Sequence, residues 1–257
     1  MAITSLTLSS MCSCTGLQSS APPPPPRLRI CCYSSTQHSV HKTLTHIHSS
    51  GVIACLRANS AELALKAAHA ALSGGISVLE IVMSTPGVFE VLQQLVQEHP
   101  TTTLGVGTVL NVEDAKNAIN AGAKFLMSPA MVKDIMVDAQ CGEVLYIPGV
   151  MTPTEILSAY DSGAKIVKVY PVSALGGSQY ISALKRPFHH ISMVASQGIT
   201  IVREYITQGA SAVVLSDAIF DKEAISQNNF NEICRLAHFA ALQGNEALEW
   251  KKRSTLK

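Results

Sequence analysis

The chain has 257 residues, of which 47% are apolar and 14% are charged, and its formal net charge is +1. That length can form one large domain or two small ones with a sizeable core. The small net charge and the 5% aromatic content give no indication of nucleic-acid binding, and no run approaches the roughly 18 apolar residues of a membrane-spanning helix. We therefore expect neither nucleic acid nor a membrane as a partner.

The first 45 residues differ in composition from the rest of the chain. No acidic residue occurs before Glu62, Ser, Thr and Cys are frequent, and a proline run at 22–26 is followed by Arg27 and Arg29. The segment lacks the charged start and continuous apolar core of a secretory signal, and its pattern is typical of an organellar transit peptide. We predict a disordered plastid transit peptide and linker over residues 1–45. A mitochondrial destination and an untargeted disordered tail are the alternatives.

The cysteines and histidines predict neither a disulfide framework nor a metal site. Four of the seven cysteines lie in the leader, and Cys55, Cys141 and Cys234 are scattered, with no Cys-x-x-Cys pair. No group of histidines, cysteines and carboxylates has the spacing of metal ligands along the chain. We expect no metal and no cofactor.

Short β-branched runs alternate with helical patterns from Val52 onward. The runs begin 20 to 26 residues apart, and helical segments such as 61–72, 88–97 and 199–208 lie between them. The predicted strands are residues 52–56, 77–82, 103–107, 124–128, 144–148, 165–171, 190–194 and 211–215.

Eight such units are the number that closes a (β/α)8 TIM barrel. We predict this barrel as a single domain over residues 46–226. Residues 227–257 are expected to form a C-terminal helix, over about 229–242, and a solvated basic tail. An open, doubly wound sheet is the alternative architecture, but the glycine-rich phosphate loop that favours it does not follow the first strand.

Lys168 lies inside an apolar run that reads A-K-I-V-K-V-Y-P. Alternation places it on the same face as Ile166 and Tyr170, and Pro171 ends the run. Desolvation disfavours an ammonium group, so part of the lysine would remain a free amine that can attack a carbonyl carbon. The alternative is a lysine whose stem packs on the strand while its head reaches water.

Glu80 is a second charged residue in an apolar strand, with Val78 and Val82 on its face. Functional groups of a barrel gather at the C-terminal ends of its strands, where a carboxylate and an amine would offset each other's desolvation. Such a carboxylate can also transfer the protons that amine addition and dehydration require. A purely structural ion pair would contain the same two residues.

Five phrases of the chain, in order and at the right spacing, resemble the 2-keto-3-deoxy-6-phosphogluconate / 4-hydroxy-2-oxoglutarate (KDPG/KHG) aldolase family. They are L-E-I-V-M-S-T (79–85), G-V-G-T-V-L-N (105–111), A-G-A-K-F-L-M-S-P (121–129), Y-I-P-G-V-M-T-P-T-E (146–155) and V-K-V-Y-P (167–171). The match, to a divergent plant-type member, covers about residues 52–220. The resemblance implies a (β/α)8 barrel, a homotrimer and a metal-free class I aldolase.

The resemblance also implies roles for individual residues. Lys168 falls on the Schiff-base lysine and Glu80 on the general acid/base. Thr108 falls on a threonine that helps to hold the pyruvate carboxylate, and Pro129 lines the same pocket. The implied reaction is cleavage of a small 2-oxo-4-hydroxy acid to pyruvate and an aldehyde such as glyoxylate or glyceraldehyde 3-phosphate.

The chain departs from the family pattern at three strand ends. The family's L-R-T, whose arginine grips the substrate carboxylate, reads M-S-T at 83–85; its P-T-G-G-I phosphate loop reads A-S-Q-G-I at 195–199; and its final G-G-S reads S-D-A at 216–218. An acid in a phosphate cradle repels the anion, so we predict a preference for an unphosphorylated substrate. The predicted substrate-binding residues beside Thr108 and Pro129 are Arg57, as the replacement cation, Ser84, Ser196 and Gly198.

A catalytically silent barrel that binds a metabolite or a partner is the main alternative function. The lost arginine and the altered phosphate loop favour it, whereas the presence of both Lys168 and Glu80 opposes it. A phosphate-binding transferase or isomerase is a weaker alternative, because it would need glycine-rich loops after the last two strands.

Overall fold

The structure, a computed structural model, describes residues 33–140 and 142–255 of the chain, and parallel strands form its centre. The strands are β1 (Val52–Leu56), β2 (Val78–Val82), β3 (Thr103–Gly107), β4 (Phe125–Met127), β5 (Leu145–Ile147), β6 (Gly149–Val150), β7 (Ile166–Val169), β8 (Ser192–Ser196) and β9 (Ala212–Leu215). They are hydrogen-bonded in the order β5-β4-β3-β2-β1-β9-β8-β7-β6.

The two ends of that order are pieces of one strand. Pro148 separates β5 from β6, and proline has no N–H to donate to a neighbouring strand. The described residues therefore form a ring of eight barrel strands, and this confirms the predicted (β/α)8 barrel. Strands β2 and β7 lie four steps apart in either direction around the ring, so their side chains face each other across its interior.

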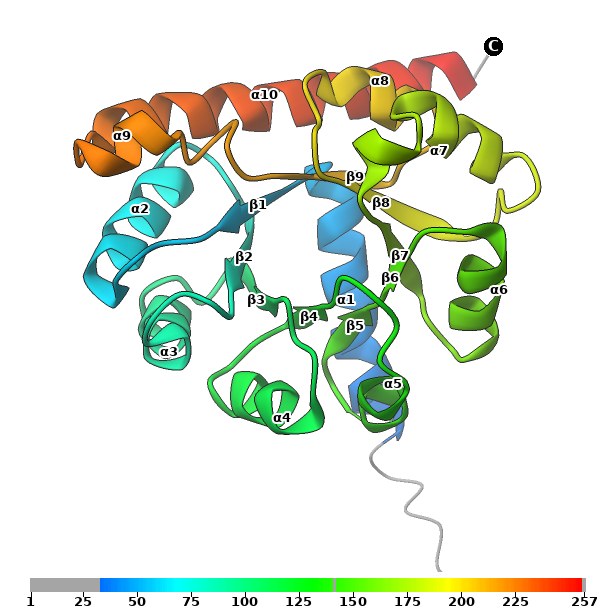
Figure 1. The fold of residues 1–257 in the computed structure, drawn as a ribbon, viewed down its shortest axis with the longest axis horizontal. Coiled ribbons are helices and arrows are strands. Elements are labelled where there is room, and N and C mark those ends of the chain that lie inside the picture. Colours follow the sequence, from blue (N-terminus) through cyan, green and yellow to red (C-terminus); the bar gives the residue numbers. More distant parts are fainter. Residues whose placement is uncertain (1–32, 141, 256–257) are drawn as a thin grey trace, which may run out of the picture. The chain divides into compact units, whose positions relative to one another are not determined.

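Helices surround the ring on its outside (Figure 1). The sequence specifies several of their beginnings: Ser60 and Asn111 each accept a hydrogen bond from a backbone N–H in the first turn of the next helix, and Thr152 forms a capping box with Glu155. The helices are α2 (Ala61–Ser73), α3 (Val88–Glu98), α4 (Val112–Asn120), α5 (Lys133–Gln140), α6 (Pro153–Asp161), α7 (Ser178–Lys185), preceded by the 3-10 helix η2 (Val172–Leu175), and α8 (Val202–Thr207).

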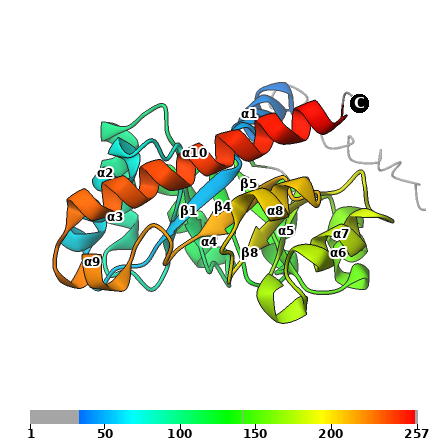
Figure 2. The same cartoon turned by 90° about the horizontal axis from the view of Figure 1, so that it is seen from above.

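The C-terminal helix α10 (Phe230–Thr255) is longer than predicted and belongs to the outer layer of the barrel. It runs along α2 and α8 (Figures 1 and 2). The helix passes the predicted end near residue 242 because its inner face stays buried as far as Ala247. The predicted basic tail is therefore helical, and Lys251 donates a hydrogen bond from Nζ to the Ala210 carbonyl oxygen at 3.1 Å.

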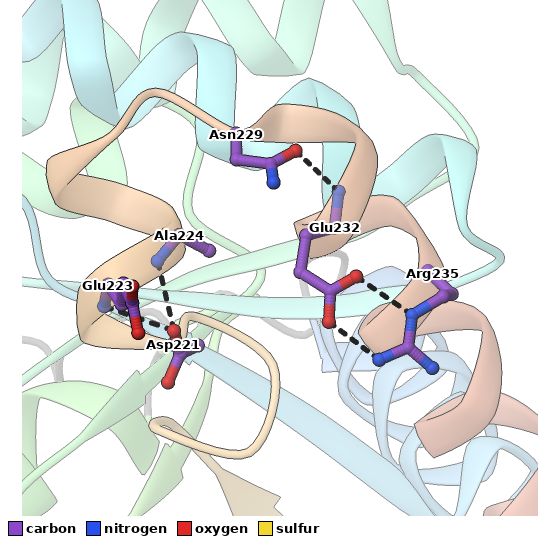
Figure 3. Close-up of polar contacts among 6 residues, drawn as sticks. All are labelled: Asp221, Glu223, Ala224, Asn229, Glu232 and Arg235. Carbon is purple, nitrogen blue, oxygen red and sulfur yellow. Dashed lines mark hydrogen bonds and ion pairs between the residues drawn. The ribbon is translucent and has the colours of Figure 1, made fainter.

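Short-range polar contacts fix the turn between α9 (Lys222–Ser226) and α10 (Figure 3). The Asp221 carboxylate accepts hydrogen bonds from the first backbone N–H groups of α9, and the Asn229 side chain accepts one from the Glu232 backbone N–H at 3.2 Å. Glu232 also pairs with Arg235 one turn later, through contacts of 2.8 and 2.6 Å. The contacts of Asp221 and Asn229 satisfy backbone N–H groups that a helix start leaves without partners.

Helix α1 (Tyr33–Ser50) closes the end of the barrel at which the strands begin. Figure 1 shows it crossing behind the ring of strands. Ile47 is fully buried in the barrel interior, with Val40 and Leu44 packed beside it at helical spacing. His46 Nδ1 lies 2.6 Å from Thr103 Oγ1 at the start of β3. The interior is thus sealed from water at this end.

Helix α1 overlaps the C-terminal part of the predicted leader and linker. Residues 33–45, which were assigned to the leader and linker, are helical, and some of their side chains pack against the barrel. Residues 1–32 lie outside the described part of the chain, so the disordered transit peptide stays a prediction. Among the described residues, no helix has both the length and the apolar character needed to cross a bilayer.

Two histidines of α1, His46 and His48, should make the stability of the folded protein depend on pH. Burial, and then the charge of Lys42, lowers the pKa of His46 below its ordinary value of 6.5. Burial, and then the charges of Lys251 and Lys185, lowers the pKa of His48 in the same direction. The unfolded chain therefore binds more protons than the folded protein as the pH falls below 6.5, and the unfolding free energy falls with it.

We expect the melting temperature of the wild type to fall between about pH 7 and pH 5 more steeply than that of the double variant His46→Gln/His48→Gln. Thermal unfolding followed by circular dichroism measures both slopes. The matched control is His238→Gln, because it makes the same substitution at an exposed histidine outside α1. We expect this variant to keep the wild-type slope. Equal slopes in all three proteins would contradict this account.

Candidate active site

Lys168 and Glu80 meet inside the barrel. Lys168 comes from β7 and Glu80 from β2, the strand directly across the ring, and their exposed fractions are 7% and 1%. Lys168 Nζ lies 3.9 Å from Glu80 Oε1, an ion pair that is too long for a hydrogen bond. Lys168 Nζ also lies 5.5 Å from the ring centroid of Tyr170. An amine and a carboxylate thus share one small, nearly dry volume.

A glycine at the end of β3 makes room for the Glu80 carboxylate. A Cβ atom at Gly107 would overlap the carboxylate, and one at Gly105 would collide with the Phe125 ring and backbone. Glu80 Oε2 is buried and has no hydrogen-bond partner among the described residues. A carboxylate with an unsatisfied buried oxygen is ready to accept a proton or a hydrogen bond from a bound molecule.

Cys55 is a third interior group of this site, and the sequence analysis missed it. It is the register partner of Glu80 in the β1–β2 pair. Burial, followed by the charge of Glu80, raises the pKa of the Cys55 thiol well above its ordinary value. The thiol therefore remains protonated and presents a weak donor toward the carboxylate. Alternation with Ile53 could have placed Cys55 on the interior face, but only the register places it beside Glu80.

Thr108 and Pro129 stand at the rim where the strands end. Thr108 follows β3, is exposed and has a φ of +64°, which is unusual for a β-branched residue. Backbone hydrogen bonds on both sides hold it: Met83 N donates to the Gly107 oxygen at 2.9 Å, and Val109 N donates to the Met127 oxygen at 3.0 Å. Strained backbone of this kind costs about 1–3 kcal/mol and is concentrated at functional sites.

Buried polar contacts support the loop that carries Pro129. Ser128 Oγ donates to the Val109 carbonyl oxygen at 2.6 Å, and Tyr146 Oη donates to Ser128 Oγ at 3.0 Å. The backbone of Pro129 passes so close to Gly149 that a Cβ atom at Gly149 would overlap the Pro129 carbonyl group. The half-buried Pro129 is therefore held firmly at the mouth of the barrel.

The remaining predicted residues lie at the same end of the strands, and in the described part of the chain no hydrogen bond or ion pair joins any of them to Lys168 or Glu80. Arg57 and Ser84 are exposed after β1 and β2, and Ser196 is buried near the end of β8. The buried residue in the M-S-T segment is Thr85, whose Oγ1 accepts a hydrogen bond from Ala58 N at 3.3 Å.

The loop after β8 has a tight backbone next to Ser173. Gln197 and Gly198 both have positive φ, of +82° and +69°, and a Cβ atom at Gly198 would collide with Ser173. Ser173 Oγ donates to Gln197 Oε1 at 3.4 Å. After β9 the chain turns at Ser216, and Asp217 is exposed at that turn. The sequence features that depart from the family pattern thus occupy the rim.

Comparison with known proteins agrees with this architecture. The family model described as KDPG and KHG aldolase matches residues 44–236. The 2-dehydro-3-deoxy-phosphogluconate aldolase of Treponema pallidum is 31% identical over 188 residues, which are 72% of this chain and 90% of that protein. The KHG/KDPG aldolase of Escherichia coli K12 is 28% identical over 70% of this chain and 85% of its own length.

A solved structure is similar over the whole barrel. It is the KDPG aldolase of Legionella pneumophila with pyruvate captured as a covalent carbinolamine intermediate. The two chains are 28% identical, and the match covers 77% of this chain and 97% of that one with a TM-score of 0.72. Because the family model matches well over half of the chain, this protein belongs to the KDPG and KHG aldolase family.

Proposed function

We propose that this protein is a class I aldolase that cleaves a 2-oxo-4-hydroxy acid to pyruvate and an aldehyde. The observation that carries the proposal is the meeting of a buried amine and a buried carboxylate, Lys168 and Glu80, 3.9 Å apart inside a barrel mouth. Imine chemistry needs a nucleophilic amine and a nearby group that gives and takes protons. Membership of the KDPG and KHG aldolase family supports the same reaction.

The reaction follows from the chemistry of these two groups. Transfer of a proton from the Lys168 ammonium to the Glu80 carboxylate frees the amine. The amine adds to the C2 carbonyl carbon of the substrate, and one proton then moves from its nitrogen to the former carbonyl oxygen to give a carbinolamine. Glu80 supplies the proton with which the hydroxyl leaves as water, so that a protonated imine forms.

In the cleavage step, Glu80 acts as a base and the imine on Lys168 accepts the electron pair. The Glu80 carboxylate takes the proton of the C4 hydroxyl while the C3–C4 bond breaks, the aldehyde leaves, and the electron pair moves to the imine nitrogen to give an enamine. Protonation at C3 and hydrolysis of the imine then release pyruvate and the free Lys168 amine. The dry site favours this chemistry, since electrostatic interactions are stronger where water is excluded.

The rim residues are proposed to hold the substrate around that pair. Thr108 and Pro129 would border the pyruvate half, and Arg57, as the cation that replaces the family's arginine, would face a carboxylate. Ser84, Ser196 and Gly198 would contact the remainder of the substrate. The constrained backbone at Thr108 and the supported loop at Pro129 favour a preformed binding site.

Two further proposals concern targeting and assembly. The acid-free, hydroxylated composition of residues 1–45 supports import into a plastid. The resemblance to the aldolase family supports a homotrimer, and the exposed apolar side chains of α6, Leu157 at 46% and Tyr160 at 42%, support α6 as a covered surface in it. Fusion of residues 1–45 to a fluorescent reporter tests the first, and analytical ultracentrifugation tests the second. A cytosolic reporter or a monomeric protein would contradict them.

Lys168 should form a covalent adduct with pyruvate. We expect treatment with pyruvate and borohydride to add one reduced pyruvate at Lys168, because only an imine is trapped by reduction. Mass spectrometry of the intact protein and of its peptides locates the adduct. Lys168→Met should abolish trapping, while the control Lys165→Met, which changes an exposed lysine three residues away, should retain it. An adduct at another lysine, or none, would contradict the proposed aldolase mechanism.

Glu80→Gln should lower the rate of cleavage by roughly 10² to 10⁴, the usual scale for the loss of a general acid/base, while the protein remains folded. Turnover per folded molecule and the melting temperature are measured together. If the pair were only structural, removing one partner would destabilise the protein by about 3–5 kcal/mol and leave the activity of the folded fraction unchanged.

Asp217 should discriminate against a phosphorylated substrate. At an effective dielectric constant of about 20, two like charges about 4 Å apart repel by about 4 kcal/mol, and the exposure of Asp217 reduces this figure. We expect the wild type to prefer 4-hydroxy-2-oxoglutarate, and Asp217→Gly to raise kcat/KM for the phosphorylated substrate more than for the unphosphorylated one.

The variant Asp217→Asn separates charge from space, because it removes the charge and keeps the side-chain volume. Steady-state kinetics with both substrates on the wild type and on each variant gives the two ratios. A wild type that already favours the phosphorylated substrate would show that other groups bind the phosphate.

A further inference from the structure

Two histidines and a glutamate gather at the end of the barrel opposite the active-site rim. His69 lies one turn before the end of α2, Glu98 is the last residue of α3, and His99 is its C-cap. The chain then leads into β2 and β3 at their first residues, so the cluster lies beside the N-terminal ends of these strands. The aldolase mechanism makes no use of it.

These side chains lie close enough together to approach a single metal ion. His69 Nδ1 lies 3.0 Å from His99 Nε2, and His69 Nε2 lies 3.1 Å from Glu98 Oε2. One ligand atom from each residue can be chosen such that all three lie within 4.8 Å of one another. Ligand atoms about 2.0–2.1 Å from a tetrahedral Zn²⁺ are themselves roughly 3.3 Å apart. His69 meets His99 and Glu98 through different ring nitrogens, so a single ion would keep one of them, and side-chain rotations would draw the three ligand atoms together from their present spacing.

Neighbouring groups hold the ligands in place. Gln94 Nε2 donates to Glu98 Oε1 at 2.9 Å, which occupies one carboxylate oxygen and leaves Oε2 directed to the cluster. The backbone of His99 is fixed at both ends, because its N–H donates to the Leu95 oxygen at 2.8 Å and its carbonyl accepts from Thr102 N at 3.0 Å. Supporting hydrogen bonds of this kind orient the ligands of protein metal sites.

The electrostatics and accessibility of the cluster also favour a cation. Glu98 supplies a negative charge, and Glu98 and His99 stand where the carbonyl groups at the end of α3 create a partial negative charge. The side chains of His69 and Glu98 are 40% and 41% exposed, so an ion can reach them and still bind water at an open position. Imidazole and carboxylate ligands together suit Zn²⁺ better than Mg²⁺ or Ca²⁺, which prefer oxygen.

We propose that His69, Glu98 and His99 form a zinc-binding site that joins the C-terminal ends of α2 and α3. Without the ion, the same side chains form a chain of hydrogen bonds. With it, the two helix ends are crosslinked, which stabilises the folded protein because the unfolded chain does not present the three ligands together. The site is structural, and aldolase turnover does not depend on it.

The test uses the full chain, freed of metal by a chelator and with its thiols alkylated, because seven cysteines could also bind zinc. Titration with ZnCl₂ by isothermal titration calorimetry gives the stoichiometry and Kd. We expect one equivalent to bind to the wild type, and His69→Ala and His99→Ala each to weaken that binding by at least about tenfold. Loss of a residue that only hydrogen-bonds to a metal ligand already weakens metal binding by about tenfold or more, and these two variants lose a ligand itself.

The control is the double variant His189→Ala/His190→Ala, which removes another pair of adjacent, exposed histidines whose rings lie 5.2 Å apart. It should bind zinc as the wild type does. As a second measurement, saturating Zn²⁺ should raise the melting temperature of the wild type and of this control, and leave that of His69→Ala unchanged.

Circular dichroism verifies that each variant is folded, and the half-exposed position of the ligands makes the substitutions mild. If the wild type bound no zinc, the cluster would be a hydrogen-bonded group only. Binding that persists undiminished in both His69→Ala and His99→Ala would place the zinc elsewhere, and either result would overturn the proposal.

Discussion

The contact between Lys168 and Glu80 across the barrel sets the requirements that the surrounding structure meets. Each charge loses most of its hydration, which costs several kcal/mol per ion, and the partner from the opposite strand offsets part of that cost. Gly107 of β3 leaves space for the carboxylate, and the half-buried Cys55 offers it a weak donor. The remaining interior side chains are mostly apolar and keep the local dielectric constant low. The chemistry of the site thus depends on closure of the ring, since β2 and β7 are far apart in the chain.

The fold could be predicted from the sequence to a large extent because its periodicity is strong. All eight predicted strands exist, and capping residues such as Ser60 and Thr152 mark helix starts. Helix α1 was missed, because its apolar stripe contains only a few residues and its composition resembles that of the leader. The continuation of α10 was also missed. Gly244 follows the predicted end, and in the structure this glycine lets the helix pass close to Ser50 and Val52.

The candidate site was only partly accessible from the sequence. Charged residues inside apolar strands identify Lys168 and Glu80, but no pattern along the chain gives the register that sets Cys55 beside Glu80. The same limit applies to His69 and His99, which are 30 residues apart and come together only when α2 and α3 pack side by side. Spacing along the chain reveals ligands that share one element. It does not reveal ligands that tertiary packing assembles.

The helix that seals the barrel has a consequence for how the protein can be made. Helix α1 precedes the first strand, yet it contacts β2, β5 and β9 as well as β1. Among the described elements, α1 leaves the ribosome first, whereas its binding surface, which also includes α10, is complete only after α10 has left the exit tunnel, more than 150 residues later. Ile47 must therefore stay unburied, or be shielded by a chaperone, during most of synthesis. The first described element to be synthesised is thus among the last to complete its native contacts.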